Sequence, residues 1–253
     1  MKIDILTLFP EMFKGPFDQS IIRRGQDKGL VEISIHNLRD WANDKHKTVD
    51  DKPFGGGVGM ILKVDVIDKA VEEIKKLRNK EIKKINKDRV KQKGKYDVSS
   101  TNVILSDASG KKFTQKEAKR LSSCKHLILI AGHYEGVDYR IQEHISDEVI
   151  SIGDYILTGG ELPAMVIIDS IVRLIPGVLE KSDATQFESF SKMETENSKI
   201  KNLLEYPQFT RPENYKGWKV PKVLLSGDHE EIKTWRNKKA LEFTRKKRPD
   251  LLK

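Results

Sequence analysis

The sequence predicts an α/β fold in which helices flank a mainly parallel sheet, followed in the chain by a small, mostly helical domain. Short apolar segments alternate with helical patterns through the first two thirds of the chain, and this alternation is typical of parallel sheets. Prolines then break an extended stretch before one capped helix. We expect an α/β domain over residues 1–179, a flexible linker over 180–200 and the small domain over 201–253.

The first elements of the predicted sheet lie before residue 101. We expect a strand over residues 3–8, a helix over 10–28, a strand over 31–38, a loop over 41–59, and a helix from Val64 that dissolves into a lysine-rich insertion over about 79–100. The loop ends in P-F-G-G-G-V-G-M. Met60 stands where a dinucleotide-binding loop needs glycine, and Met60 with Ile61 replaces the Lys-Ser/Thr of a phosphate loop, so both sites are excluded.

The next elements complete the α/β domain. We expect strands over residues 101–106, 126–131 and 148–152, a short helix after Gly110 with a capping box of Thr114 and Glu117, a short helix through Ile141, and a helix from near Glu161 that stops at Pro176 and Gly177. In open α/β sheets, ligands lie beyond the carboxyl ends of the strands. The loops after Leu105, Ala131 and Ile152 should therefore converge on one pocket.

Residues 151–178 are the most informative part of this pattern. Gly153, Gly159 and Gly160 follow the last strand, where a chain without Cβ atoms leaves room for a ligand. The helix after them is apolar on all sides and should be buried by more than one neighbour. It nevertheless carries Asp169 and Arg173, four residues apart. They either form a structural ion pair, or Arg173 directs its guanidinium at a ligand.

Charge and composition indicate a nucleic-acid partner. The net charge is +9, while residues 75–95 alone carry +9 and residues 233–253 carry +7. Two basic patches on an otherwise acidic chain favour a polyanion, with solvated lysine faces as the alternative. A single cysteine, Cys124, fits a reducing compartment, and the sequence shows neither a signal peptide nor an apolar run that could span a membrane. We expect a cytoplasmic protein with no membrane partner.

Long motifs then identify a family resemblance. They are L-T-L-F-P-E-M-F, P-F-G-G-G-V-G-M, G-H-Y-E-G-V-D, S-I-G-D-Y-I-L-T-G-G-E-L-P-A-M, R-L-I-P-G-V-L, Y-P-Q-F-T-R-P and V-P-K-V-L-L-S-G-D-H-E-E-I-K-T-W-R. In order and spacing, they resemble the bacterial tRNA (guanine-N1)-methyltransferase family, which methylates guanosine 37 beside the anticodon. The resemblance covers nearly the whole chain, and only residues 75–100 lack a clear counterpart.

This resemblance implies a SPOUT-class fold with a deep trefoil knot, a homodimer, a tRNA substrate held across both subunits by a tRNA-binding C-terminal domain, and S-adenosyl-L-methionine as methyl donor. Knots are rare exceptions to ordinary chain topology, and no periodicity predicts one. The implied cofactor-binding residues are Leu105, Ser106, Gly132, Tyr134, Glu135, Ile152, Gly153, Asp154, Tyr155, Ile156, Leu157, Gly159 and Gly160.

The resemblance also implies two catalytic residues. Arg173 would stabilise negative charge on the guanine oxygen, and a carboxylate before Ser189 would take the N1 proton. The family usually has aspartate there, whereas this chain has Glu188, and Asp183 is the alternative base. The sequence does not determine whether Mg²⁺ is required, and it predicts no metal ligands.

Smaller departures from the family pattern concern the pocket itself. The turn L-S-D-A-S-G is one residue longer than usual, which leaves the contacts of residues 107–109 open, and His133 stands where arginine also occurs. We expect His133 to be a hydrogen-bonding prop, with a catalytic role as the alternative. Two rival functions remain: a knotted methyltransferase for another RNA position, and a catalytically inactive RNA-binding relative.

Overall fold

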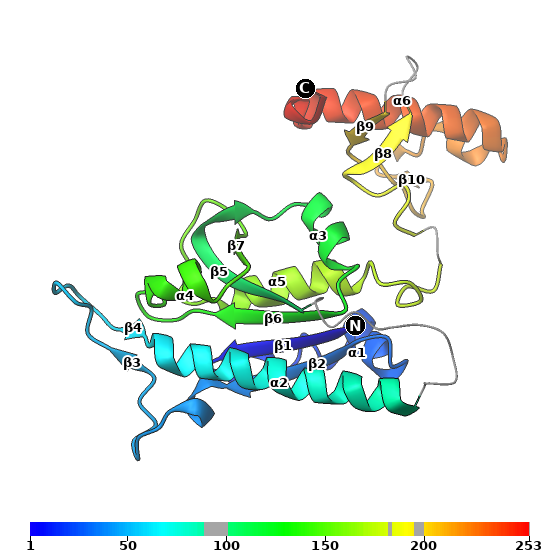
Figure 1. Cartoon of the computed structure of the whole chain (residues 1–253). Coiled ribbons are helices and arrows are strands. Elements are labelled where there is room, and N and C mark those ends of the chain that lie inside the picture. Colours follow the sequence, from blue (N-terminus) through cyan, green and yellow to red (C-terminus); the bar gives the residue numbers. More distant parts are fainter. Residues whose placement is uncertain (89–100, 182–183, 195–199, 253) are drawn as a thin grey trace. The chain divides into compact units, whose positions relative to one another are not determined.

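The computed structural model describes residues 1–88, 101–181, 184–194 and 200–252. It divides the chain into two compact units, Met1–Leu179 and Glu180–Lys253 (Figure 1). Unit 1 holds the large sheet, and unit 2 holds the C-terminal helix. The expectations for residues 89–100 and for Asp183 lie outside the described residues.

A five-stranded parallel sheet forms the centre of unit 1. Its order is β2-β1-β6-β5-β7, with β1 at Lys2–Thr7, β2 at Glu32–Asn37, β5 at Thr101–Lys112, β6 at His126–Ala131 and β7 at Glu148–Ser151. Every pairing between neighbours in this sheet is parallel, as the alternation of strand and helix patterns predicts. The mainly parallel α/β class is therefore confirmed.

Helices cover both faces of this sheet (Figure 1). Side chains alternate along each strand, so Leu127 and Leu129 of β6 pack on one face and Ile128 and Ile130 on the other. The first face packs with α1 (Ser20–Asp27), α3 (Gln115–Leu121), α5 (Glu161–Val172) and the short helix η1 (Pro10–Phe13). The second packs with α2 (Val64–Asp88), α4 (Tyr139–His144) and the short helix η2 (Leu38–Trp41).

Two helix predictions in the first part of unit 1 are wrong. The single helix expected over residues 10–28 is divided into η1 and α1, because Gly15 adopts a φ of +90° and Pro16 follows it. Helix α2 does not dissolve near residue 79 but continues to Asp88. Among the residues of α2 from Val64 to Glu81, the last buried one is Ile74, so the described turns after it place no side chain in the core.

Strand β5 is longer than predicted because it contains a bulge. It pairs with β7 as far as Ser106, leaves the register, and pairs again from Lys111. Gly110 permits the return, since a Cβ atom there would lie 2.6 Å from the backbone nitrogen of Ile150. Residues 107–110, between the two pairings, form the bulge, which lies toward the carboxyl end of β5.

The expected capping box of α3 does not form. Thr114 is the N-cap residue, but its side chain makes no capping hydrogen bond. The Glu117 carboxylate instead accepts from Lys111 Nζ at 2.7 Å and from Arg120 Nε at 2.8 Å. Two charged donors have replaced the backbone amide as partners of this carboxylate.

Helix α5 differs from its prediction in two ways. It ends at Val172, four residues before the expected stop at Pro176. It is also not buried on all sides, because Leu162 and Val166, one turn apart, are 48% and 47% exposed. The remaining apolar residues of the helix lie in the core, so α5 presents one apolar stripe to its surroundings.

One carboxylate lies inside the sheet, away from its carboxyl end. Asp4 of β1 accepts hydrogen bonds from His36 and His126, both at 2.7 Å, and His126 also contacts Thr101 Oγ1 at 2.9 Å. Burial raises the pKa of the Asp4 carboxyl, but the hydrogen bonds from the two histidines outweigh that effect and leave the pKa well below its usual range.

Unit 2 is small and is built around one helix. Asp228 is the N-cap residue of helix α6 (His229–Lys247), and its carboxylate accepts hydrogen bonds from the backbone amides of Glu230 and Glu231. The predicted cap is therefore confirmed. The other elements are β8 (Ser191–Glu194), β9 (Ile200–Leu203), β10 (Asn214–Tyr215), β11 (Trp218–Lys219), η3 (Lys222–Leu225) and η4 (Pro249–Leu252). Strand β8 falls within the expected linker and pairs antiparallel with β9.

Candidate active site

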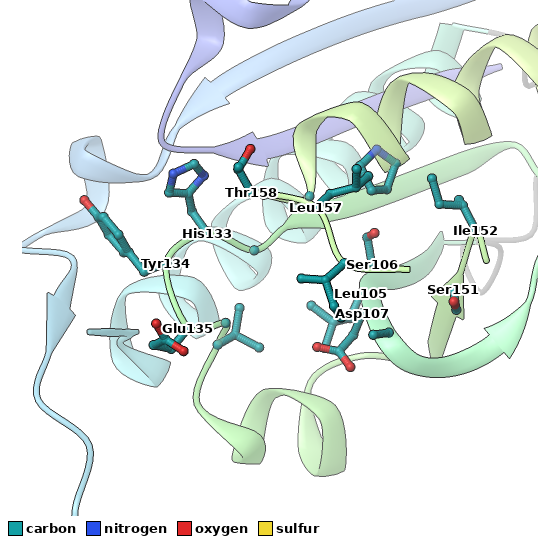
Figure 2. Close-up of a pocket in the computed structure, with 18 of the residues that line it drawn as sticks. Leu105, Ser106, Asp107, His133, Tyr134, Glu135, Ser151, Ile152, Leu157 and Thr158 are labelled. Carbon is teal, nitrogen blue, oxygen red and sulfur yellow. The ribbon is translucent and has the colours of Figure 1, made fainter. Parts of the chain in front are cut away.

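A cavity of about 230 Å³ opens beyond the carboxyl ends of β5, β6 and β7. Figure 2 shows Leu105, Ser106 and Asp107 on β5 opposite the loop that carries His133, Tyr134 and Glu135. Residues 151–153 and 155–160 complete the wall, with Ile152 and Leu157 among them. The convergence of the three loops, predicted from the strand order along the chain, is confirmed.

The loop after β6 is held by the short strand β4 (Ile61–Leu62), which pairs with β3 (Asp50–Asp51). The Glu135 amide donates to the Met60 carbonyl at 3.1 Å, and the Leu62 amide donates to the Gly136 carbonyl at 3.0 Å. Gly59 lies so close to Glu135 that a Cβ atom there would overlap the glutamate side chain. The glycine-rich loop that ends at Met60, excluded above as a phosphate site, thus supports the cavity by holding the loop after β6.

The loop after β7 crosses the loop after β6 with its backbone. The Gly160 amide donates to the Gly132 carbonyl at 2.6 Å. A Cβ atom on Gly160 would lie 2.7 Å from the Gly132 nitrogen and 2.8 Å from the Ala131 Cα atom. Glycine is needed here for close approach between two backbones, and its φ is an ordinary negative one.

A buried carboxylate stands beside this crossing. Glu161 is 1% exposed and accepts from Thr7 Oγ1 at 2.8 Å, while its other oxygen lies 3.4 Å from His133 Nδ1. The His133 ring also packs on Phe9, with ring centroids 4.6 Å apart. These contacts fix His133 from two sides and join the end of β1 to both cavity loops. The arrangement suits a histidine that supports the loops through hydrogen bonds.

The cavity combines apolar walls with two carboxylates. Leu105, Ile152 and Leu157 offer apolar surface for a flat ring, whereas Asp107 and Glu135 supply negative charge. A ligand with an aromatic part and a positive centre matches this lining. A methyl-donating sulfonium attached to a nucleoside has both properties, so the residues present fit S-adenosylmethionine.

Comparison with known proteins identifies the family. A family model described as tRNA (Guanine-1)-methyltransferase TrmD matches residues 1–253, the whole chain. The chain belongs to this family. Its relatives named tRNA (guanine-N(1)-)-methyltransferase include proteins from Dictyoglomus turgidum (52% identical over 252 residues), Carboxydothermus hydrogenoformans (49% over 253) and Dehalococcoides mccartyi strain BAV1 (47% over 251). These alignments cover 99–100% of this chain and 88–90% of each relative.

The resemblance assigns thirteen residues to the cofactor. Twelve of them line the cavity of this member of the tRNA (Guanine-1)-methyltransferase family. The exception is Asp154, whose side chain is 92% exposed and lies 3.5 Å from Lys112 Nζ. The cavity also has lining residues that the resemblance did not assign: Asp107, Ala108, His133, Gly136, Val137, Ser151, Thr158 and Pro163. Asp107 directly follows a predicted strand end, a signal that could have found it.

The two predicted catalytic residues lie in different units of the chain. Arg173 is the C-cap residue of α5 in unit 1, and its amide donates to the Asp169 carbonyl at 3.3 Å. Glu188 lies in unit 2, where its carbonyl accepts from the Ser191 amide at 3.0 Å. Their catalytic roles stay predictions.

The described residues hold neither a cluster of metal-ligating side chains nor a helix that could span a membrane. Within residues 1–88, 101–181, 184–194 and 200–252, no three His, Cys, Asp or Glu side chains are grouped as a metal site would require. No helix in the same part of the chain has the length and apolar character needed to span a bilayer.

Proposed function

We propose that this protein transfers the methyl group of S-adenosylmethionine to the N1 atom of guanosine 37 in tRNA. Methylation of guanine N1 in tRNA is the activity that names the family, and the match of that family's model to the entire chain carries this part of the proposal. Position 37 and the methyl donor are what the resemblance of the sequence motifs implies. The cavity supports it, because its apolar walls and carboxylates fit a nucleoside that carries a sulfonium.

The reaction needs few protein groups. The guanine N1 atom attacks the methyl carbon, the bond between that carbon and sulfur breaks, and the N1 proton leaves. We propose that the Glu188 carboxylate takes this proton and that the Arg173 guanidinium stabilises the negative charge developing on the guanine oxygen. S-adenosylmethionine supplies the activated methyl group when bound.

The proposal includes a knotted topology and a homodimer. The backbone crossing at Gly160 and Gly132 is consistent with a chain that threads through its own loop. The exposed pair Leu162 and Val166 on α5 offers an apolar surface for a second copy. Met12, 42% exposed, lies on η1, which packs against α5. We further propose that residues 201–253 bind the tRNA through their excess of lysine and arginine.

The test uses labelled S-adenosylmethionine and two unmodified tRNA transcripts. One carries guanosines at positions 36 and 37, and the other has position 37 replaced. We expect label in the first transcript alone. Equal labelling of both would indicate methylation at another position, and cofactor binding without labelling of either would indicate an inactive RNA-binding relative.

A further inference from the structure

A second open cavity lies entirely within unit 2. Its volume of about 530 Å³ falls in the range of about 300–1,000 Å³ typical of small-molecule sites. Residues 206–213, η3 and α6 all contribute to its lining. The apolar part of the lining comes from Pro207, Val220, Leu224, Leu225 and Ile232.

Aromatic and guanidinium groups occupy this lining together. The Arg236 guanidinium lies over the Tyr206 ring, 4.9 Å from its centroid. Phe209 is 49% exposed, and its ring centroid lies 6.4 Å from that of Trp235. Both Tyr206 and Phe209 line the cavity. Flat aromatic faces that stay exposed in a small unit are suited to stacking on another flat ring.

The charge around the cavity favours an anionic partner. Residues 201–253 contain 14 lysines and arginines against 7 aspartates and glutamates. Arg211 and Arg236 are the cations in the lining, and Glu213 is its one carboxylate among the described residues. Gln208 and Thr210 add neutral hydrogen-bonding groups. A partner that combines flat rings, polar edges and phosphates matches all of these features.

We propose that this cavity binds an unpaired nucleobase of the RNA substrate, an inference that rests on the proposed function. The base stacks on the exposed aromatic and guanidinium faces, while the neighbouring cations contact the phosphates beside it. The polar lining contacts the edge of the base. Unit 2 then holds a defined nucleotide in addition to attracting the RNA by charge.

Matched pairs of substitutions in the full-length chain separate stacking from charge. Phe209→Leu and Arg236→Gln alter the cavity. Phe243→Leu and Arg245→Gln are the controls, because Phe243 is 37% exposed and both residues lie on α6 outside the lining. Affinity for an unmodified tRNA transcript is measured by fluorescence anisotropy over a series of salt concentrations.

Both arginine variants should reduce the salt slope by about one, since each removes one cation. At high salt, where the electrostatic contribution is weak, Phe209→Leu and Arg236→Gln should bind roughly tenfold more weakly than the parent, the effect of losing one stacked base. The two controls should stay within about threefold of the parent.

Three outcomes would overturn the proposal. The first is that the cavity variants bind tRNA as their controls do at high salt. The second is that they change the melting temperature or the oligomeric mass while tRNA binding is unchanged, and this result would make the cavity a contact site for protein. If the parent protein binds no tRNA, the proposed function fails as well. If the parent binds and methylates tRNA but the variants match their controls, only the nucleobase site fails.

Discussion

Glu188 carries the proposed proton transfer on a side chain one methylene longer than the aspartate usual in its family. The ordinary acidities are close, about 4.3 for glutamate against about 3.9 for aspartate, so chain length rather than basicity is what differs. We expect Glu188→Gln to lower the single-turnover methylation rate by at least ~10²-fold, because it removes a positioned base. Cofactor affinity, measured by calorimetry, should be nearly unchanged.

Two further variants make this assignment decisive. Glu188→Asp restores the family residue and should keep substantial activity. Asp183→Asn tests the alternative base. If Asp183→Asn is inactive while Glu188→Gln methylates at the parent rate, the base is Asp183.

Gly160 permits a backbone crossing that the Cβ atom of any other residue would obstruct. We expect Gly160→Ala to lower the free energy of unfolding by about 1–3 kcal/mol, because its Cβ atom would overlap Gly132 and Ala131. It should also weaken binding of S-adenosylmethionine. Urea denaturation and calorimetry measure the two effects.

Gly132→Ala is the matched control, since a Cβ atom there would meet only Val137 Cγ1 at 3.4 Å, an ordinary contact. Equal stability of the two variants would show that the crossing relaxes without cost.

Asp4 makes stability depend on acid pH. Its pKa is lowered in the folded protein, so its contribution is complete above the unfolded pKa of about 3.9 and is lost as the pH falls below that value. We expect Asp4→Asn to reduce the free energy of unfolding by about 2 kcal/mol at pH 6.5, through the loss of two charge-assisted hydrogen bonds. The difference from the parent should shrink by pH 3.5 in urea denaturation. A difference of the same size at both pH values would exclude this explanation.

At the scale of elements, we expect the lysine-rich end of α2 to be dispensable for folding. Among the residues of α2 from Val64 to Glu81, the last buried one is Ile74, and Glu81 lies 3.4 Å from Lys2 at the start of β1. Lys2 is opposite His126 in the sheet, and His126 is opposite Thr101. The part of α2 near Glu81 and the start of β5 therefore lie at the same end of the sheet. A short connection can therefore join them.

We accordingly expect deletion of residues 80–95 to leave folding and cofactor binding intact. Because the sequence from 75 to 95 carries a net +9, tRNA binding should weaken at most through a shallower salt dependence. Circular dichroism, calorimetry and a salt titration provide the measurements. Loss of cofactor binding would show that this segment is structural.

The elements that could be predicted are those whose pattern is set by burial. The strands β1, β6 and β7 contain short apolar segments with buried residues, and β2 alternates apolar with polar residues, so the positions of all four follow from the sequence alone. Predictions failed where one local feature decides the outcome. Gly15 divides a helix, and Lys111 and Arg120 bind the Glu117 carboxylate that the predicted capping box requires. The exposed stripe on α5 could not be predicted, since apolar residues there look the same whether the fold or a second copy covers them.

The cavity could be located from the sequence, because parallel strands deliver their loops to one edge. The contacts that support the cavity could not be predicted from the sequence. Glu161 meets Thr7 across 154 residues of sequence, and no periodicity links the two. The bulge in β5, which places Asp107 in the lining, is a break in register that the apolar pattern of the strand does not reveal.

At the scale of the whole molecule, we expect a homodimer. The chain has a mass of 29.0 kDa, so light scattering should give twice that value, about 58 kDa. Val166→Lys places a charge on the exposed stripe of α5 and should shift the mass toward that of the monomer, whereas Lys116→Glu, an exposed change on α3, should not. A parent protein that stays monomeric at micromolar concentration would contradict the prediction.

The bulge in β5 has a consequence for protein engineering. Strand β5 leaves the register after Ser106 and rejoins it at Lys111, opposite the same residue of β7. The strands on either side should therefore keep their pairing when residues are inserted before Gly110, whose lack of a Cβ atom the return requires. Insertions there should be tolerated as they are in surface loops, although Asp107 and Ala108 line the cavity. A library that varies the length of this segment could select enzymes for bulkier sulfonium donors, with the scaffold left untouched.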